Sequence, residues 1–150
     1  AGQIIFEFNQ DAVLKAGAVS EENLARLASL GFALSMDHVQ TLALDFQHLK
    51  GLGFRYLKVR ASTLTAGMSG AKASVAAEDI KRLLARNGLN LIAERVEDEK
   101  TVVQLLDYAV DYAQGYLFGE PRAVREDSLR AGSREAMERA APVIPLRRTG

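Results

Sequence analysis

Five short apolar segments of this sequence each carry one polar residue at or near their end. The five residues are Glu7, Asp37, Lys58, Glu94 and Gln114. One acid at such a place often caps the following helix, but a polar residue in all five segments favours a functional cluster. Carboxylate oxygens suit hard cations such as Mg²⁺ and Mn²⁺, which lower the pKa of a bound water and neutralise charge on a phosphodiester. The set therefore predicts metal-assisted phosphoester or carbonyl chemistry, or a relic of it.

The elements that position these residues alternate along the chain between strands and helices. The apolar runs predict strands at residues 4–8, 32–36, 54–59, 89–93 and 110–113. Helical spacing predicts helices at residues 24–30, 42–49, 76–87, 99–108 and, interrupted, 124–141. Ser20 is the expected N-cap of the first helix, and residues 60–74 are expected to form a loop. Alternating βα units require a parallel α/β sheet, whose active site lies at the carboxyl ends of its strands.

The composition excludes several classes of function. The chain has 150 residues, of which 48% are hydrophobic and 25% charged, as in ordinary globular domains. Nineteen basic and nineteen acidic residues give zero net charge, so we expect no nucleic-acid partner. Cysteine is absent, which excludes disulfides and thiolate sites and is compatible with a reducing compartment. No apolar run approaches the roughly 20 residues of a membrane span.

Several motifs resemble those of EAL domains, bacterial phosphodiesterases that hydrolyse cyclic di-GMP. Residues 94–97 (ERVE) and 114–118 (QGYLF), with Pro121, resemble the family's EGVE and QGYxF…P signatures. Residues 7–10, 35–40 and 57–60 stand where the family has ExTE, LDDFG and LKID. The resemblance covers about residues 4–129. It implies an incomplete TIM-type (β/α) barrel of about five C-terminal βα units in residues 1–129, followed by a helical or irregular tail in residues 130–150.

The resemblance also implies roles for individual residues. Lys58 and Glu94 would be catalytic, the lysine near the reacting water and the glutamate in the metal and water network. Glu7 and Asp37 would ligate Mg²⁺ or Mn²⁺ in an active member. The implied nucleotide-binding residues are Gln114, Tyr116, Pro121 and Arg95.

Departures from the family pattern predict a weakened site. His38 stands in place of the second aspartate of DDFG, and an imidazole lacks the negative charge that a hard metal pair requires. Gln10 replaces the second acid of ExTE, which removes the expected anchor of the loop after Asp37; Glu97 would be the structural acid that helps to hold this loop. Arg60 and Arg95 replace an aspartate and a glycine. They would either bind phosphate or, in the interpretation we favour slightly, take the metal's place beside Glu94 and Asp37.

The leading functional hypothesis is a degenerate EAL domain without efficient hydrolysis and with no metal bound in this fragment. It would act in the bacterial cytoplasm as a cyclic di-GMP receptor or as a module that binds a protein partner or a second copy. The alternatives are an active phosphodiesterase completed by upstream residues and a scaffold that binds no nucleotide. A (β/α)₈ barrel typically needs about 250 residues, so about three strands, with the Glu-Ala-Leu motif and a metal-binding asparagine, are expected before Ile4. An open sheet edge should then be covered by a second copy or by the tail.

Overall fold

A twisted sheet forms the centre of the computed structural model, which describes residues 4–66, 68–69, 74–120 and 144–146. The strands lie in the order β1-β2-β3-β6-β7-β8, and the first five are parallel. Their bounds are Ile5–Asn9, Ala33–Asp37, Phe54–Arg60, Asn90–Glu94, Tyr112–Ala113 and Ile144–Pro145. The expected parallel α/β sheet is therefore confirmed, with every predicted strand present.

The central strands are largely buried because most of their side chains are apolar. Leu34 of β2, Phe54 and Leu57 of β3 and Leu91 of β6 are all fully buried. Strands β3 and β6 pair in a register that sets Lys58 beside Ile92 and Arg60 beside Glu94. Alternate residues of a strand point to the same face. The register therefore brings Lys58, Arg60 and Glu94 to one face at the carboxyl ends of the strands.

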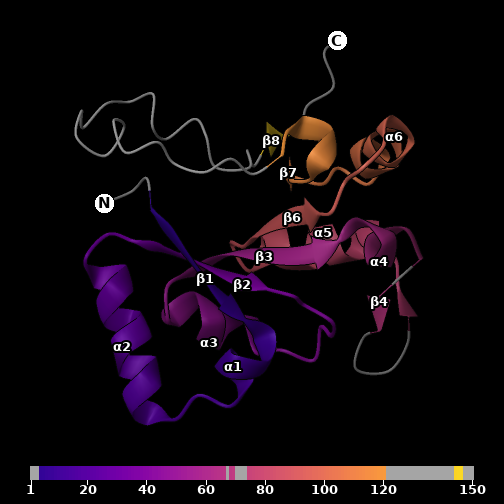
Figure 1. The fold of residues 1–150 in the computed structure, drawn as a ribbon. Helices are drawn as coiled ribbons and strands as arrows, with labels where there is room; N and C mark the ends of the chain where they lie inside the picture. The colour runs from indigo at the N-terminus through magenta and orange to yellow at the C-terminus, as the bar shows by residue number, and fades with distance from the viewer. Residues whose placement is uncertain (1–3, 67, 70–73, 121–143, 147–150) are drawn as a thin grey trace, which may run out of the picture.

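Helices cover the sheet through one apolar stripe each. In Figure 1, α1, α2 and α3 group beside β1 and β2, while α5 lies beside β6. The residues that pack inward include Leu24 of α2, Leu49 of α3, Ile80 and Leu84 of α5 and Leu105 of α6. The helix bounds are Gln10–Leu14, Ala18–Ser29, Phe46–Gly51, Ala61–Ala66, Ala77–Arg86 and Glu99–Asp107 for α1 to α6, and Tyr116–Phe118 for the short 3₁₀ helix η1.

The expected starts of two helices were wrong. Helix α2 begins after Gly17 and not at Ser20, whose backbone N–H already donates to the Gly17 carbonyl at 2.9 Å. Helix α3 begins after Asp45, whose carboxylate caps the His48 N–H at 2.9 Å. The residues from 42 to 44 precede the helix.

The segment at residues 60–74 is not all loop. It contains α4 and a short antiparallel hairpin of β4 (Met68–Ser69) and β5 (Ser74–Val75). Helix α4 forms because its Ala61 and Leu64 are buried in the core, with 2% and 1% exposed. The sequence analysis missed this helix because serine and threonine residues surround its two buried apolar positions.

The two edges of the sheet differ. Strand β8, from the C-terminal tail, pairs antiparallel with β7 and covers that edge, which confirms the expectation of a covering tail there. On β1, the opposite edge, Ile4, Ile5 and Phe6 are 51%, 41% and 37% exposed. The predicted boundary at residue 129 and the predicted helix at residues 124–141 lie outside the described residues. No described helix is long and apolar enough to cross a membrane.

Candidate functional site

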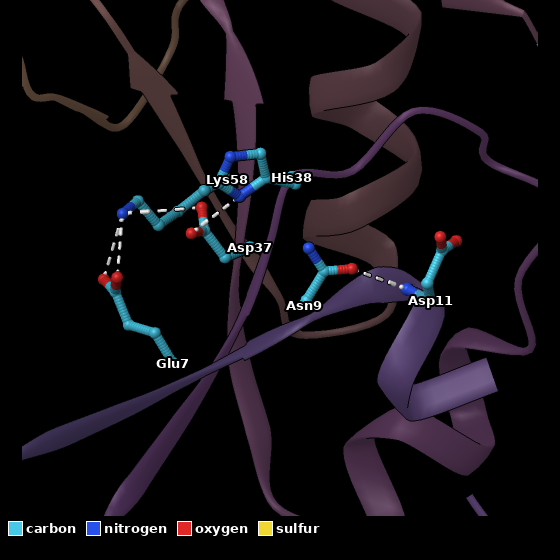
Figure 2. A network of polar contacts seen from close by, with 6 residues as sticks. All are labelled: Glu7, Asn9, Asp11, Asp37, His38 and Lys58. Carbon is cyan, nitrogen blue, oxygen red and sulfur yellow. Dashed lines mark hydrogen bonds and ion pairs between the residues drawn. The ribbon is translucent and has the colours of Figure 1, made fainter. Parts of the chain in front are cut away.

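Lys58 joins two acids from neighbouring strands. Its side chain is buried in β3, and its Nζ donates to both carboxylate oxygens of Glu7 at 3.1 and 3.0 Å. The same Nζ lies 3.6 Å from Asp37 Oδ1. Figure 2 shows the ammonium between the two carboxylates. A buried ammonium needs such partners because burial removes its hydration. Lys58 is therefore the cation that compensates Glu7 and Asp37.

Asp37 ends β2 and bonds to the residue after it. Its Oδ2 lies 2.9 Å from Nδ1 of His38, whose backbone has a φ of 53°. Histidine is among the residues that tolerate this left-handed region. Burial raises the pKa of Asp37, but the Lys58 ammonium and hydrogen bonds from His38 outweigh it and leave that pKa below its ordinary value. Asp37 is thus held as a carboxylate.

Glu94 ends β6 and completes a group of ligand atoms. Ligand atoms of Asp37, His38 and Glu94 all lie within 4.8 Å of one another. Asp37 Oδ1 and Glu94 Oε1 are buried and have no hydrogen-bond partner among the described residues. Burial and the nearby Asp37 charge raise the pKa of Glu94, partly opposed by Lys58, His38 and Arg95. Two carboxylates, each with one buried oxygen that accepts no hydrogen bond among the described residues, and one imidazole are a donor set that fits a divalent cation such as Mn²⁺.

Two cavities flank Glu94. One, of about 330 Å³, is lined by Lys58, Glu94, Arg95, Glu97, Gln114, Gly115, Tyr116 and Gly119. The other, of about 400 Å³, is lined by His38, Val39, Gln40, Arg60, Thr63 and Glu94. The structure therefore brings together the predicted residues Lys58, Glu94, Arg95, Gln114 and Tyr116. Pro121 lies outside the described residues.

The segment that carries Gln114 and Tyr116 is bound to the backbone of Val96. The Val96 N–H donates to the Gln114 carbonyl at 3.1 Å, and the Leu117 N–H donates to the Val96 carbonyl at 3.2 Å. A Cβ on Gly115 would meet the Val96 oxygen at 2.1 Å. Glycine at this position thus permits the close approach that brings Tyr116 to the rim of the cavity.

The loop after His38 keeps an anchor, so the expectation that Gln10 removes it is wrong. Gln10 is buried; its Nε2 donates to the Thr41 carbonyl at 2.8 Å, and its Oε1 accepts from the Gln40 and Thr41 N–H groups at 2.8 and 3.4 Å. A neutral amide makes these contacts because it both donates and accepts. Gln10 therefore holds the loop through hydrogen bonds and not through charge.

Glu97 and the two arginines differ from their expected contacts. Glu97 is exposed, and no hydrogen bond or ion pair among the described residues joins it to the loop after His38. Neither Arg60 nor Arg95 forms an ion pair with Glu94 or Asp37 within the described part of the chain; Lys58 and His38 contact Asp37 instead. The interpretation of the arginines as substitutes for the metal stays a prediction, since the charge of Arg95 acts on Glu94 without a direct ion pair. Sequence reasoning also missed Thr63, which lies on α4, because the segment was expected to be a loop.

The chain matches one protein family and is similar to several bacterial proteins. A family model described as the EAL domain matches residues 1–121. The cyclic di-GMP phosphodiesterase RocR of Pseudomonas aeruginosa is 27% identical over 118 residues, which are 79% of this chain and 30% of RocR. The cyclic di-GMP phosphodiesterase PdeF of Escherichia coli is 28% identical over 122 residues, 81% of this chain and 16% of PdeF. The chain thus spans less than a third of the length of either relative.

Solved structures show the same fold. The EAL enzyme Bd1971, in a form with cAMP and cyclic di-GMP bound, matches with a TM-score of 0.62 and 26% identity over 78% of this chain and 31% of that chain. The EAL domain of Mycobacterium smegmatis DcpA matches with a TM-score of 0.64 and 22% identity over 94% of this chain and 61% of that chain. The described sheet is a partial, unclosed TIM-type barrel, as the sequence predicted.

Proposed function

Because the chain belongs to the EAL domain family, we propose that it is a degenerate member that binds cyclic di-GMP and hydrolyses it weakly or not at all. Its relatives RocR and PdeF are cyclic di-GMP phosphodiesterases, and their ligand class is the natural candidate here. Arg95, Gln114 and Tyr116 line the 330 Å³ cavity beside Glu94, and the proposal makes this cavity part of the nucleotide site.

The observation that carries the proposal is the donor set at the strand ends. Asp37, His38 and Glu94 offer three ligand atoms, enough for one divalent cation. Glu7 is bound by Lys58 through both carboxylate oxygens. A two-metal site stabilises the attacking and leaving oxygens together, and an imidazole at position 38 brings no negative charge to such a pair. A site that holds one cation and not two therefore favours binding of the cyclic dinucleotide over its rapid hydrolysis.

Each side chain of the site would have a separate role in binding the ligand or in proton transfer. A cation at Asp37, His38 and Glu94 would supply positive charge beside a phosphodiester. Lys58 holds Glu7 and Asp37 in place through the ion pairs already described. Glu94, with its raised pKa and its free buried Oε1, holds or releases a proton at that oxygen. Tyr116, 65% exposed, offers its ring at the cavity rim to a base.

The substitution His38→Asp tests this proposal. It restores a third carboxylate to the ligand group at a left-handed position that aspartate also tolerates. We expect it to increase the rate of cyclic di-GMP hydrolysis in Mn²⁺ by tenfold or more. His48→Asp is the matched control, because the His48 side chain is exposed, its imidazole bonds to Glu21, and it lines neither cavity. Unchanged activity in His38→Asp would argue that His38 is not what weakens the site.

An active phosphodiesterase is the second candidate. The buried oxygens Asp37 Oδ1 and Glu94 Oε1, which accept no hydrogen bond among the described residues, favour it, because both could ligate a metal together with residues outside this chain. Wild-type turnover that His38→Asp leaves unchanged would establish this candidate. A scaffold that binds no nucleotide would show neither turnover nor binding. The leading proposal also includes self-association or binding to a protein partner. It includes a location in the bacterial cytoplasm, with which the absence of cysteine is compatible.

A further inference from the structure

Arg60 brings a guanidinium to one side of the candidate site. It is the last residue of β3, is exposed, and pairs in register with Glu94 of β6. It lines the 400 Å³ cavity together with His38, Thr63 and Glu94. This cavity has the size of small-molecule sites, which begin at about 300 Å³. The guanidinium and the Thr63 hydroxyl are hydrogen-bond donors for an anion there.

Arg95 brings a second guanidinium to the other side of Glu94. It lines the 330 Å³ cavity with Lys58 and Gln114, and its backbone has a φ of 57°. This left-handed conformation suits glycine and strains a long side chain. Residues held in such conformations cluster at binding sites, where the surrounding structure fixes them. The strain at Arg95 therefore points to a use for its side chain.

Both guanidiniums have their donors available. Within the described residues, the side chains of Arg60 and Arg95 make no hydrogen bond or ion pair, whereas that of Lys58 is bound by Glu7. Three cationic side chains, Lys58, Arg60 and Arg95, line the two cavities against two acidic ones, Glu94 and Glu97. Because Glu7 and Asp37 compensate Lys58, the remaining charges of the lining balance. What the lining offers to a phosphate is two planar guanidinium groups that can bind it through paired donors.

We propose that Arg60 and Arg95 bind the phosphodiester groups of a cyclic dinucleotide from the two sides of Glu94. The inference rests on the proposed function and adds to it the residues that hold the ligand's charge. Asp37, His38 and Glu94 would hold a cation and the two arginines would contact the phosphodiesters themselves, so both arginines should contribute to affinity with or without metal. Arginine at these positions would then partly replace the electrostatic role of a second cation.

Calorimetric titration of the purified protein with cyclic di-GMP tests the proposal, once in Mn²⁺ and once in EDTA. Arg60→Ala and Arg95→Gly should each raise Kd by roughly tenfold in both buffers, the loss expected for a charge-assisted hydrogen bond. Arg95→Gly is informative because glycine relieves the strain at a φ of 57° and so leaves the fold intact. Arg60→Lys keeps the charge but not the paired donors, and we expect an intermediate Kd.

Arg55→Ala is the matched control. Arg55 is exposed at the other end of β3 and contacts the Phe54 carbonyl, away from both cavities. Thermal unfolding of each variant verifies its fold. Wild-type binding with unchanged Kd in Arg60→Ala and Arg95→Gly would overturn the inference and leave the proposed function standing. If the wild-type protein does not bind cyclic di-GMP, the proposed function and the inference both fail.

Discussion

Asp37 and Glu94 belong to one group of ligand atoms, yet their pKa values move in opposite directions. Burial acts on both, but Lys58 lies 3.6 Å from Asp37 and His38 donates to it, so the pKa of Asp37 is lowered. Glu94 lacks a hydrogen-bond partner for its Oε1 among the described residues, and its pKa is raised. Neighbouring carboxyls with pKa values pushed apart are typical of sites where one acid stays charged and the other exchanges a proton.

The raised pKa of Glu94 predicts that its buried charge lowers the stability of the fold while it supports cation binding. Because this pKa is higher in the folded than in the unfolded chain, folding is favoured below the ordinary value of 4.5 and loses that advantage as the pH rises through the folded pKa. Glu94→Gln removes the cost of a buried charge. We expect its free energy of unfolding in urea to exceed that of the wild type by about 1 kcal/mol at pH 7, and its Mn²⁺ affinity to fall.

The same measurement near pH 4 supplies the internal check. There Glu94 is largely protonated in both states, so the difference from Glu94→Gln should shrink. Glu22→Gln, on the exposed surface of α2, is the control for loss of a surface carboxylate. A Glu94→Gln protein that is less stable than the wild type at pH 7 would contradict this account of the buried carboxyl.

At the scale of elements, the site depends on a backbone contact between two loops. Gly115 lies against Val96, where a Cβ would meet the Val96 O and N at 2.1 and 2.3 Å. Gly115→Ala must displace the segment that carries Gln114 and Tyr116. We expect it to lower the free energy of unfolding by about 2 kcal/mol and to weaken nucleotide binding.

Gly51→Ala is the matched substitution. Gly51 lies at the end of α3 with no atom within 4 Å of its would-be Cβ, so alanine should be neutral or stabilise the helix by a few tenths to ~1 kcal/mol. Urea denaturation and calorimetry distinguish the two variants. Equal stability of Gly115→Ala and Gly51→Ala would show that the Val96 contact is not required.

Elements with strong periodicity could be predicted from the sequence, whereas contacts between elements could not. The strand ends that hold Asp37, Lys58 and Glu94 followed from apolar runs alone. Helix α4 was missed because its inward stripe consists of Ala61 and Leu64 among serines and threonines. The anchoring by Gln10 was missed because replacement of an acid suggested lost charge, while the contact needs only an amide facing the backbone of Thr41.

At the scale of the whole molecule, the sheet ends at β1 with exposed apolar side chains. Ile4, Ile5 and Phe6 expose about half to a third of their surface, and no described strand pairs with the outer edge of β1. Unpaired strand edges with apolar side chains promote association between chains. We expect the purified chain to self-associate through β1 as its concentration rises in sizing chromatography.

Ile5→Lys should shift the purified chain toward the monomer, because charge on an edge strand opposes edge-to-edge pairing. Leu30→Lys is the control, since Leu30 is 60% exposed just after α2 and is not part of β1. A wild-type chain that elutes as a monomer at every concentration would contradict the role assigned to β1.

The central claim is that this EAL domain binds cyclic di-GMP at a site fit for one cation and does not turn it over efficiently. The most direct test incubates the purified protein with cyclic di-GMP and Mn²⁺, measures binding by calorimetry, and separates the nucleotides by chromatography afterwards. We predict saturable binding with the cyclic dinucleotide recovered intact. Conversion of many equivalents to the linear dinucleotide would contradict the claim.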